Sequence, residues 1–223
     1  SKGLVLRPKT YHVNYCHSPT RQVWDLSHGY KHRIFQHFLR IWDRQASTRV
    51  DKYIANSSHV QRRIQKYYHR ESTVIYPPVS TNAPQPPLIN KRGSEGEFLI
   101  ISRLYKHKNV DIAVKAFSKL GLNLVIIGDG PERKYLESIA GPTVKLLGSL
   151  SDLQATNYYL QCSAFVLPQE EDFGISAIEA MSHGKPVLAL RRGGALEYIQ
   201  EGVNGHFFDE AHEAVLADGV RRI

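Results

Sequence analysis

The sequence predicts an α/β fold, with a doubly wound parallel sheet in the C-terminal part of the chain and a smaller, incomplete α/β half before it. From residue 98 onward, short apolar runs alternate with amphipathic segments, as in parallel strands that helices cover on both faces. The first 80 residues hold only three strand-like runs, which are few for an independent sheet.

The composition is that of a folded protein from a reducing compartment. Apolar residues make up 42% of the 223 residues and charged residues 22%, which excludes a disordered or collagen-like chain. The apolar runs are far too short to span a membrane, and no apolar signal segment is expected. The only cysteines, Cys16 and Cys162, exclude a disulfide framework. We therefore expect a cytoplasmic protein.

Charge divides the chain into two modules. Residues 1–95 carry 16 Lys or Arg against 5 Asp or Glu, whereas residues 96–223 carry 13 against 16. A basic half beside a slightly acidic half predicts two different roles, and the basic half is expected to meet something anionic. Nucleic acid, an anionic membrane face and a phosphorylated substrate are all candidates on charge alone.

The N-terminal half is expected to contain three strands, at 10–16, 52–55 and 73–76. Asn56, Ser57 and Ser58 are candidate caps for a helix at 58–68, and the apolar residues of segment 32–49 recur at helical spacing. Prolines from Pro77 onward predict an extended linker. We therefore divide the chain into a remnant of an N-terminal domain (1–80), a linker (81–96) and a C-terminal domain (97–223).

The C-terminal half alternates strands with helices. Strands are expected at 98–102, 123–127, 144–147, 164–167, 186–190 and 205–208. Helices are expected between them, at 110–120, 132–140, 152–161 and 178–182. Domains of this kind bind ligands outside the carboxyl ends of their strands, so the loops that begin there are the candidate sites.

Two glutamates, Glu171 and Glu179, follow the strand at 164–167 and are separated by seven residues. Glu171 falls in a strand-to-helix loop and Glu179 inside the helix. Gly174 allows a ligand to approach the backbone and the positive end of the helix dipole. Carboxylates suit sugar hydroxyls because they accept two hydrogen bonds in a fixed geometry, although a solvated acidic loop and an ordinary helical glutamate explain the same residues.

Three cations share the loop after the strand at 98–102, namely Arg103, Lys106 and Lys108. Arginine grips two phosphate oxygens through its fork, and lysine adds a mobile point charge. The place of this loop at the carboxyl end of a strand favours a diphosphate site over an ordinary basic surface loop.

Two further loops contain paired glycines. Gly128 and Gly130 begin a dinucleotide fingerprint, but Arg133 stands where its third glycine is expected, so a turn explains them better and a dehydrogenase is rejected. Gly193 and Gly194 either turn backbone N–H groups toward an anion or form a tight turn.

Histidines offer one candidate reactive group and no metal site. His17 ends the strand at 10–16, although a lone histidine is more often structural. His28, His32 and His37 have partly helical spacing, but no cysteine or carboxylate set completes a metal site. Since the chain has no Asp-x-Asp triplet, a carboxylate-held divalent cation for a diphosphate is not expected. No cofactor is expected either.

Together, these loops specify a nucleotide-diphosphate sugar better than any of them does alone. The chain resembles the retaining glycosyltransferases of family 4, which have the GT-B fold of two facing Rossmann-like domains. The motifs are Ser-Arg-Leu…Lys at 102–108, Gly-Asp-Gly-Pro at 128–131, Glu-Asp-Phe-Gly…Glu-Ala-Met at 171–181 and Gly-Gly-Ala-Leu-Glu at 193–197. Four upstream motifs, at 16–21, 24–25, 54–57 and 74–79, are similar to the mannosyltransferase- or hexosyltransferase-like branch that builds bacterial surface polysaccharides.

The resemblance implies a role for each matching residue. Arg103 and Lys108 neutralise the departing diphosphate, Glu171 orients sugar hydroxyls, and His17 lies across the cleft near the transferred sugar; these four are the candidate catalytic residues. The resemblance also assigns Glu179 to the ribose and segment 147–150 to the base. The candidate donor-binding residues are Ser102, Leu147, Gly148, Asp172, Phe173, Gly174, Ile175 and Glu179. Family members retain anomeric configuration, through attack on one face assisted by the leaving phosphate.

Members of the family are considerably longer than this chain. The resemblance implies that most of the N-terminal domain, including its first strand and glycine-rich loop, and the last helices of the C-terminal domain are missing from these residues. We therefore expect nucleotide affinity with an incomplete acceptor site.

The expected function is transfer of a hexose from UDP-hexose or GDP-mannose to a saccharide or lipid-linked saccharide; the alternative is a non-catalytic nucleotide-sugar-binding module. Segment 31–49 is basic and amphipathic, so it either packs on its own domain or lies on an anionic membrane, which would make the protein peripheral on the inner membrane face. Nucleic acid is not expected as a partner, because the basic half lacks a recognition helix or stacking aromatics.

Overall fold

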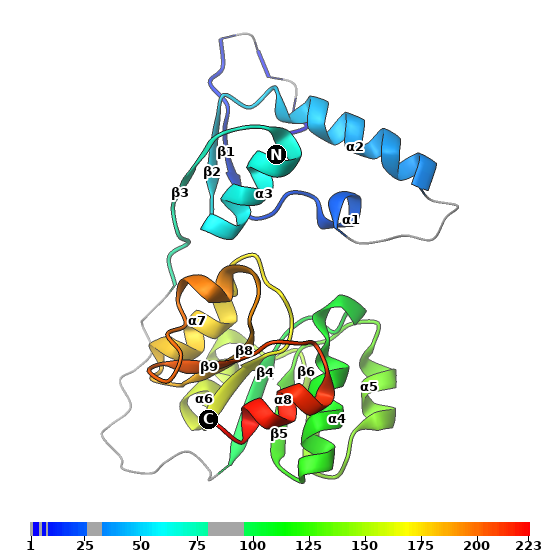
Figure 1. Ribbon diagram of the computed structural model, residues 1–223, viewed down its shortest axis with the longest axis vertical. Helices are drawn as coiled ribbons and strands as arrows, with labels where there is room; N and C mark the ends of the chain where they lie inside the picture. The colour runs from blue at the N-terminus through cyan, green and yellow to red at the C-terminus, as the bar shows by residue number, and fades with distance from the viewer. Residues whose placement is uncertain (1, 5, 8, 26–32, 80–95) are drawn as a thin grey trace. The chain divides into compact units, whose positions relative to one another are not determined.

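The computed structural model describes residues 1–223 apart from 1, 5, 8, 26–32 and 80–95 (Figure 1). The chain divides into two compact units, an N-terminal unit (Ser1–Pro77) and a C-terminal unit (Pro78–Ile223). The expected linker at 81–96 lies outside the described residues except for Gly96.

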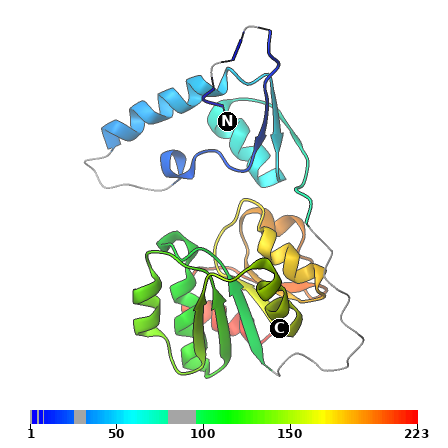
Figure 2. The ribbon, with the colours of Figure 1, turned by 180° about the vertical axis from the view of Figure 1, so that it is seen from behind.

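The described residues of the C-terminal unit form a parallel sheet of six strands in the order β6-β5-β4-β7-β8-β9 (Figures 1 and 2). In chain order these are β4 (Glu97–Ile101), β5 (Asn123–Ile127), β6 (Val144–Gly148), β7 (Ala164–Leu167), β8 (Val187–Leu190) and β9 (Gly205–Phe208). Every pairing in this sheet is parallel. The predicted doubly wound α/β fold is therefore confirmed.

Helices cover both faces of this sheet. On one face, α4 (Val110–Leu120), α5 (Arg133–Ile139) and α8 (Glu213–Val220) share a core with strand residues such as Ile100. On the other, α6 (Asp152–Gln161) and α7 (Ile175–Ser182) share a core with residues such as Leu99. Because neighbouring residues of one strand enter opposite cores, the strands read as continuous apolar runs.

The direction of strand addition reverses beside β4. After β4 the chain adds β5 and β6 on one side, then crosses back to place β7, β8 and β9 on the other. The carboxyl ends of β4 and β7 therefore form the topological switch point, the place where open α/β sheets bind their ligands. The loops that leave these two strands carry Lys108 and Glu171.

The described part of the N-terminal unit contains a three-stranded parallel sheet in the order β1-β2-β3. Its elements are β1 (Val13–Cys16), α1 (Arg21–Trp24), α2 (Arg33–Ser47), β2 (Lys52–Ala55), α3 (Ser58–Tyr68) and β3 (Ser72–Val74). Tyr53, Val60 and Ile64 belong to a buried cluster that joins α3 to the sheet. The Ser57 hydroxyl caps α3, accepting the Val60 N–H at 3.0 Å.

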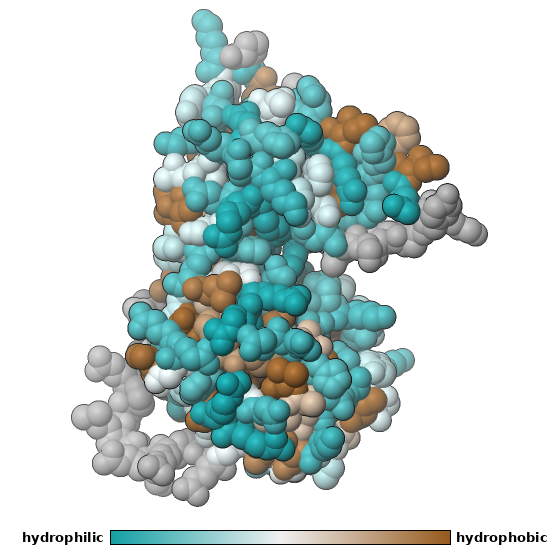
Figure 3. All heavy atoms as spheres, in the orientation of Figure 1, coloured by the Kyte–Doolittle hydropathy of each residue, from teal (hydrophilic) through white to brown (hydrophobic). Residues whose placement is uncertain are grey.

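Helix α2 turns its polar side toward the N-terminal unit. Gln36 and Asp43 are buried, and Asp43 accepts hydrogen bonds from Trp24 Nε1 at 2.8 Å and the Tyr68 hydroxyl at 2.9 Å. The apolar side chains are between 54% and 74% exposed: Ile34, Phe35, Phe38, Ile41 and Trp42. Brown spheres gather over α2 in Figure 3. The sequence left two arrangements open for this apolar stripe, packing onto its own domain or lying on an anionic membrane. Among the described residues, the stripe does not pack onto its own domain.

Three expected elements differ from the structure by more than a single residue at one end. The strand expected at 10–16 begins at Val13, and the one expected at 73–76 spans Ser72–Val74. The helix expected at 178–182 begins at Ile175, because Gly174 adopts a φ of 90° and starts the helix earlier than its apolar spacing indicates. Helix α1 and a 3-10 turn at Gly193–Glu197 are too short to show a periodic pattern and were not predicted.

Candidate functional site

An ion pair joins the two loops at the switch point. The Lys108 Nζ atom lies 2.5 Å from Glu171 Oε1. Lys108 ends a short 3-10 turn (Lys106–Lys108) after β4 and is buried, whereas Glu171, on the loop after β7, is half-buried. The fold thus brings together two candidate catalytic residues that lie 63 positions apart in the sequence.

Gln169 donates to the same carboxylate oxygen. Its side chain is buried, and its Nε2 atom lies 2.8 Å from Glu171 Oε1. Both protein donors therefore meet Oε1, and no residue in the described ranges hydrogen-bonds Oε2. A carboxylate oxygen left open beside a buried cation can accept a ligand hydroxyl.

Helix α7 begins on the loop after β7, at the switch point. Gly174 precedes it with a φ of 90°, a conformation that glycine adopts without strain. A Cβ atom on Gly174 would lie 2.6 Å from the Tyr198 hydroxyl, so the loop has no room for a side chain. Phe173 is buried, Asp172 is half-buried and Ile175 is exposed. The first N–H groups of α7, at the positive end of its dipole, therefore belong to the same loop region as Glu171.

The loops after β4, β5 and β6 approach one another through glycine. A Cβ atom on Gly128 would lie 1.9 Å from the Ser102 carbonyl oxygen, and the Gly128 N–H donates to the Gly148 carbonyl at 2.8 Å. Leu147, next to Gly148, is half-buried. Gly128 therefore serves backbone packing, in agreement with its interpretation as a turn. It also brings Ser102, on the loop after β4, close to Leu147 and Gly148 at the end of β6.

The Gly193–Gly194 pair packs against the backbone of the loop that carries Glu171. The Gly194 N–H donates to the Glu171 carbonyl at 2.8 Å, and a Cβ atom on Gly193 would lie 2.2 Å from the same oxygen. The idea that this pair turns N–H groups toward an anion is therefore wrong for Gly194, because the Glu171 carbonyl accepts its proton. The pair instead supports the loop that carries Glu171.

A hydrogen bond between α6 and α7 holds the Glu179 carboxylate. The Tyr159 hydroxyl on α6 donates to Glu179 Oε2 on α7 at 2.8 Å. Burial, and then the Glu179 carboxylate, raise the pKa of Tyr159, so its hydroxyl keeps its proton and acts as a donor. The candidate ribose-binding carboxylate is thus anchored by one oxygen.

Arg103 is exposed at the start of the loop that carries Lys108. Its guanidinium carbon lies 5.8 Å from the centre of the Tyr105 ring. Within the described part of the chain it forms no ion pair, so its fork remains available to an anionic ligand.

His17 follows β1 in the N-terminal unit and is exposed. Its ring lies edge-on to Tyr15 at 5.1 Å, and its carbonyl accepts a hydrogen bond from Asn56 Nδ2 at 3.1 Å. The loop that follows is held by an ion pair between Arg63 and Asp25. His17 therefore stands at the carboxyl end of a parallel strand, as the sequence predicts.

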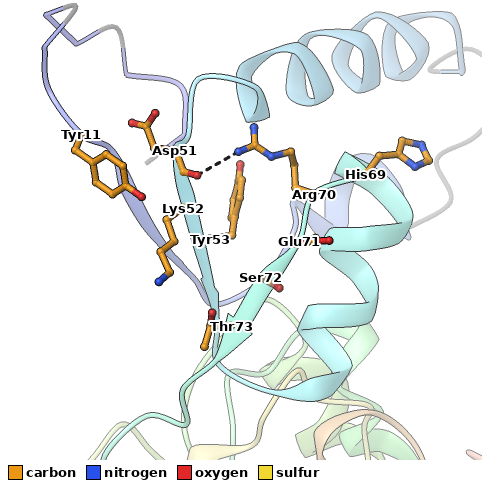
Figure 4. A pocket seen from close by; sticks show the side chains of 9 residues that line it. All are labelled: Tyr11, Asp51, Lys52, Tyr53, His69, Arg70, Glu71, Ser72 and Thr73. Carbon is orange, nitrogen blue, oxygen red and sulfur yellow. Dashed lines mark hydrogen bonds between the residues drawn. The ribbon is translucent and has the colours of Figure 1, made fainter.

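A pocket of about 540 Å³ lies at the opposite end of the N-terminal sheet, where β2 and β3 begin (Figure 4). Figure 4 shows the Arg70 side chain among its lining residues, and Arg70 donates to the backbone carbonyl of Val50 at 2.6 Å. None of the candidate site residues lines this pocket. It is therefore separate from the chemistry expected at the carboxyl ends of the strands.

In the part of the chain that the structure describes, no three His, Cys, Asp or Glu side chains gather as they do around a metal ion. His28 and His32, two members of the histidine set considered above, lie outside the described residues. No helix within the same ranges has the length and apolar character needed to cross a membrane.

Sequence reasoning missed Gln169, Tyr159 and Tyr198. The one available signal was the position of Gln169 two residues before Glu171, on the same loop. Tyr159 and Tyr198 reach the site from other elements, and no spacing in the sequence announces such contacts. Burial raises the pKa of Tyr198, whose hydroxyl has no hydrogen-bond partner in the described residues.

The fold and these loops define an α/β protein that binds its ligand at the switch point of a parallel sheet. Residues 83–223 match the family model described as glycosyl transferases group 1, and residues 2–83 match the model described as Glycosyltransferase Family 4. The chain therefore belongs to the group 1 glycosyltransferases, within family 4.

Curated relatives agree with this family. An uncharacterized glycosyltransferase of Methanocaldococcus jannaschii is 29% identical over 171 residues, which cover 74% of this chain and 47% of the relative. A GDP-mannose-dependent alpha-mannosyltransferase of Corynebacterium glutamicum is 36% identical over 110 residues, which cover 49% of this chain and 26% of the relative. The chain thus spans about half or less of these relatives.

Solved structures share the GT-B fold over most of the chain. The Anabaena protein HepE, in complex with UDP and glucose, has a TM-score of 0.76 at 21% identity, with 94% of this chain and 61% of that one covered. A sucrose-phosphate synthase from Thermosynechococcus elongatus has a TM-score of 0.80 at 20% identity, with 95% and 58% covered. At these identities the similarity establishes the fold.

Proposed function

We propose that the protein is a retaining glycosyltransferase that transfers a hexose from UDP-hexose or GDP-mannose to a saccharide or lipid-linked saccharide in surface-polysaccharide synthesis. The ion pair between Lys108 and Glu171 carries the proposal, because it sets a cation suited to a diphosphate beside a carboxylate suited to sugar hydroxyls. The Corynebacterium relative, a GDP-mannose-dependent alpha-mannosyltransferase, and the UDP bound to HepE support this donor class.

In the proposed reaction, the loop after β4 receives the diphosphate. Arg103 grips phosphate oxygens through its exposed fork, and Lys108 exchanges the Glu171 carboxylate for a phosphate oxygen. Both cations then stabilise the negative charge that develops on the departing diphosphate, an effect of about 3 kcal/mol for one well-placed donor. These two cations supply the charge that a metal ion would otherwise contribute, so the proposal needs no metal and no cofactor.

The hexose is proposed to lie between Glu171 and the start of α7. Glu171 Oε2 accepts a sugar hydroxyl, and the backbone N–H groups near Phe173, Gly174 and Ile175 contact the sugar and the nearest phosphate. The acceptor hydroxyl attacks the anomeric carbon on the face from which the diphosphate leaves, and a phosphate oxygen takes its proton. We assign His17 a place near the transferred sugar.

The nucleoside is proposed to lie along the loops after β4 and β6. Glu179 accepts the ribose hydroxyls. The backbone around Ser102, Leu147 and Gly148 contacts the base, which is where UDP and GDP are distinguished. Both assignments rest on the family motifs that these residues match.

Helix α2 is proposed to hold the protein on the anionic inner face of a membrane, close to a lipid-linked acceptor. Its exposed apolar stripe, which includes Phe35 and Phe38, is flanked by the exposed cations Arg33 and Arg44. An amphipathic helix with apolar and basic groups in this arrangement inserts its apolar side between lipid headgroups while its cations meet anionic lipids.

A non-catalytic nucleotide-sugar-binding module is the alternative, because the residues proposed to hold the donor, Arg103, Lys108 and Glu171, would serve such a module equally well. An assay of sugar transfer from the donor decides between the two, because a binding module would hold the donor without transferring its sugar.

The proposed donor site is tested by thermal shift with UDP, GDP, ADP and TDP, without metal, on the wild type, Arg103→Ala and Arg62→Ala. Arg62 is an exposed arginine on α3 and serves as the matched control. We expect one nucleotide to stabilise the wild type and Arg62→Ala but not Arg103→Ala. Stabilisation that survives Arg103→Ala, or no stabilisation by any nucleotide, would contradict the proposal.

A further inference from the structure

The carboxylate of Glu179 is half satisfied within the protein. Its Oε2 atom accepts the Tyr159 hydroxyl at 2.8 Å. Its Oε1 atom receives no hydrogen bond from any residue in the described ranges. One oxygen is therefore fixed while the other keeps its capacity to accept a ligand hydroxyl.

Tyr159 is itself held by its surroundings. The residue is 4% exposed, and its ring stacks on His183 with a centroid distance of 5.3 Å and an interplanar angle of 17°. The Phe165 ring lies 5.9 Å away on the sheet side. His183 also lies close to the backbone of the glutamate, with its Nδ1 atom 2.7 Å from the Glu179 carbonyl oxygen. A packed ring of this kind holds its hydroxyl at one point, so α6 determines the position of a carboxylate on α7.

The direction of this hydrogen bond is fixed by chemistry. A tyrosine hydroxyl with a raised pKa stays protonated at neutral pH, and an ionised carboxylate can only accept. Phenylalanine at position 159 would keep the packed ring and remove the donor. The carboxylate of Glu179 would then lose its anchor while the helices remain in place.

We propose that Tyr159 is a positioning residue that makes the donor site selective for ribonucleotides. By holding Oε2, Tyr159 directs Oε1 of Glu179 toward the 2′- and 3′-hydroxyls of the ribose. A 2′-deoxyribonucleotide lacks one of these partners and therefore binds less tightly. This inference rests on the proposed function, because it takes Glu179 as the contact of the donor's ribose.

The test is calorimetric titration with UDP, GDP and their 2′-deoxy counterparts. For the nucleotide that binds, the wild type is expected to prefer the ribonucleotide about tenfold, as a hydrogen bond to a charged group implies. Tyr159→Phe is expected to reduce this preference to about threefold or less, mainly by weakening ribonucleotide binding. Tyr158→Phe is the matched control, since Tyr158 is the neighbouring residue on α6 and its hydroxyl has no partner among the described residues. We expect it to keep the wild-type preference.

The outcomes separate this inference from the proposed function. Equal binding of both nucleotides by the wild type, or an unchanged preference in Tyr159→Phe, overturns the role of Tyr159 and leaves the nucleotide site standing. A wild type that binds no nucleotide overturns the proposed function itself. If Tyr159→Phe does not fold, Glu179→Gln takes its place, and an unchanged preference in that variant also overturns the inference.

Discussion

Lys108 Nζ lies 2.5 Å from Glu171 Oε1, across the switch point between β4 and β7. The two charges neutralise each other in a setting where the lysine side chain is 10% exposed and the glutamate side chain 22%. A phosphate that binds Lys108 must compete with Glu171 for it. Binding of the diphosphate and freeing of the sugar-binding carboxylate are therefore one event in the proposed site.

Replacing Lys108 by methionine is expected to weaken both the fold and the nucleotide site. Glu171 loses its charged partner, which lowers the free energy of unfolding by about 1–3 kcal/mol. Nucleoside diphosphate affinity falls by about tenfold or more, because a charge-assisted contact is lost. Urea unfolding and calorimetric titration measure the two effects. Lys119→Met is the control, because Lys119 is an exposed lysine of α4 outside the loop that carries Lys108. Equal effects of both substitutions would refute the assignment.

Replacing Gly174 by alanine is expected to destabilise the protein more than the same change at Gly184. Both glycines have positive φ, 90° and 73°, so both substitutions carry a backbone penalty of about 1 kcal/mol. A Cβ atom at Gly174 meets the Tyr198 hydroxyl at 2.6 Å, whereas one at Gly184 meets nothing within 4 Å. Overpacking adds about 1–3 kcal/mol at Gly174 alone. Urea unfolding measures the difference, and equal losses would mean that the loop has room for a side chain.

Alkaline pH is expected to destabilise the fold through its buried tyrosines. Burial raises the pKa of Tyr159, Tyr198 and Tyr68 in the folded protein. The folded state therefore holds these protons more tightly than the unfolded state does. Their contribution to stability is complete below about pH 10, the pKa of an unfolded tyrosine, and is lost as pH rises further.

Unfolding followed by circular dichroism and tyrosinate absorbance tests this pH dependence. We expect the absorbance of these buried tyrosinates to appear together with the loss of secondary structure above about pH 10. Complete ionisation of all tyrosines in a protein that remains folded would show that these three side chains are accessible to solvent.

The apolar stripe of α2 is expected to bind vesicles that contain phosphatidylglycerol. Phe35→Ser combined with Phe38→Ser is expected to lower the affinity by about tenfold or more, because two exposed aromatic side chains no longer enter the lipid. High salt weakens binding as well, through Arg33 and Arg44. Leu153→Ser is the control, since Leu153 is an exposed apolar residue of α6 in the other unit. Sedimentation that neither salt nor the phenylalanine changes affect would exclude a membrane role for this stripe.

The parallel sheet could be predicted because its inner strands, such as β5, β7 and β8, are buried on both faces and read as apolar runs. The position of Glu171 after a strand was visible for the same reason. The contact of Lys108 with Glu171 could not be predicted. It depends on the strand order that places β4 beside β7, and no pattern in the sequence reports that order. The Tyr159–Glu179 hydrogen bond is likewise a packing result between two helices. The exposed apolar stripe of α2 could not be predicted either, because amphipathic spacing identifies a helix but does not tell which of its sides packs against the protein.

The most direct test of the proposed donor site is titration of the isotope-labelled protein with UDP and with GDP, followed by the backbone amide resonances. We predict that one nucleotide shifts the amides of Arg103, Lys108, Gly148 and Gly174 together, at the carboxyl ends of β4, β6 and β7. Shifts confined to the pocket around Arg70, or no shifts with either nucleotide, would contradict it.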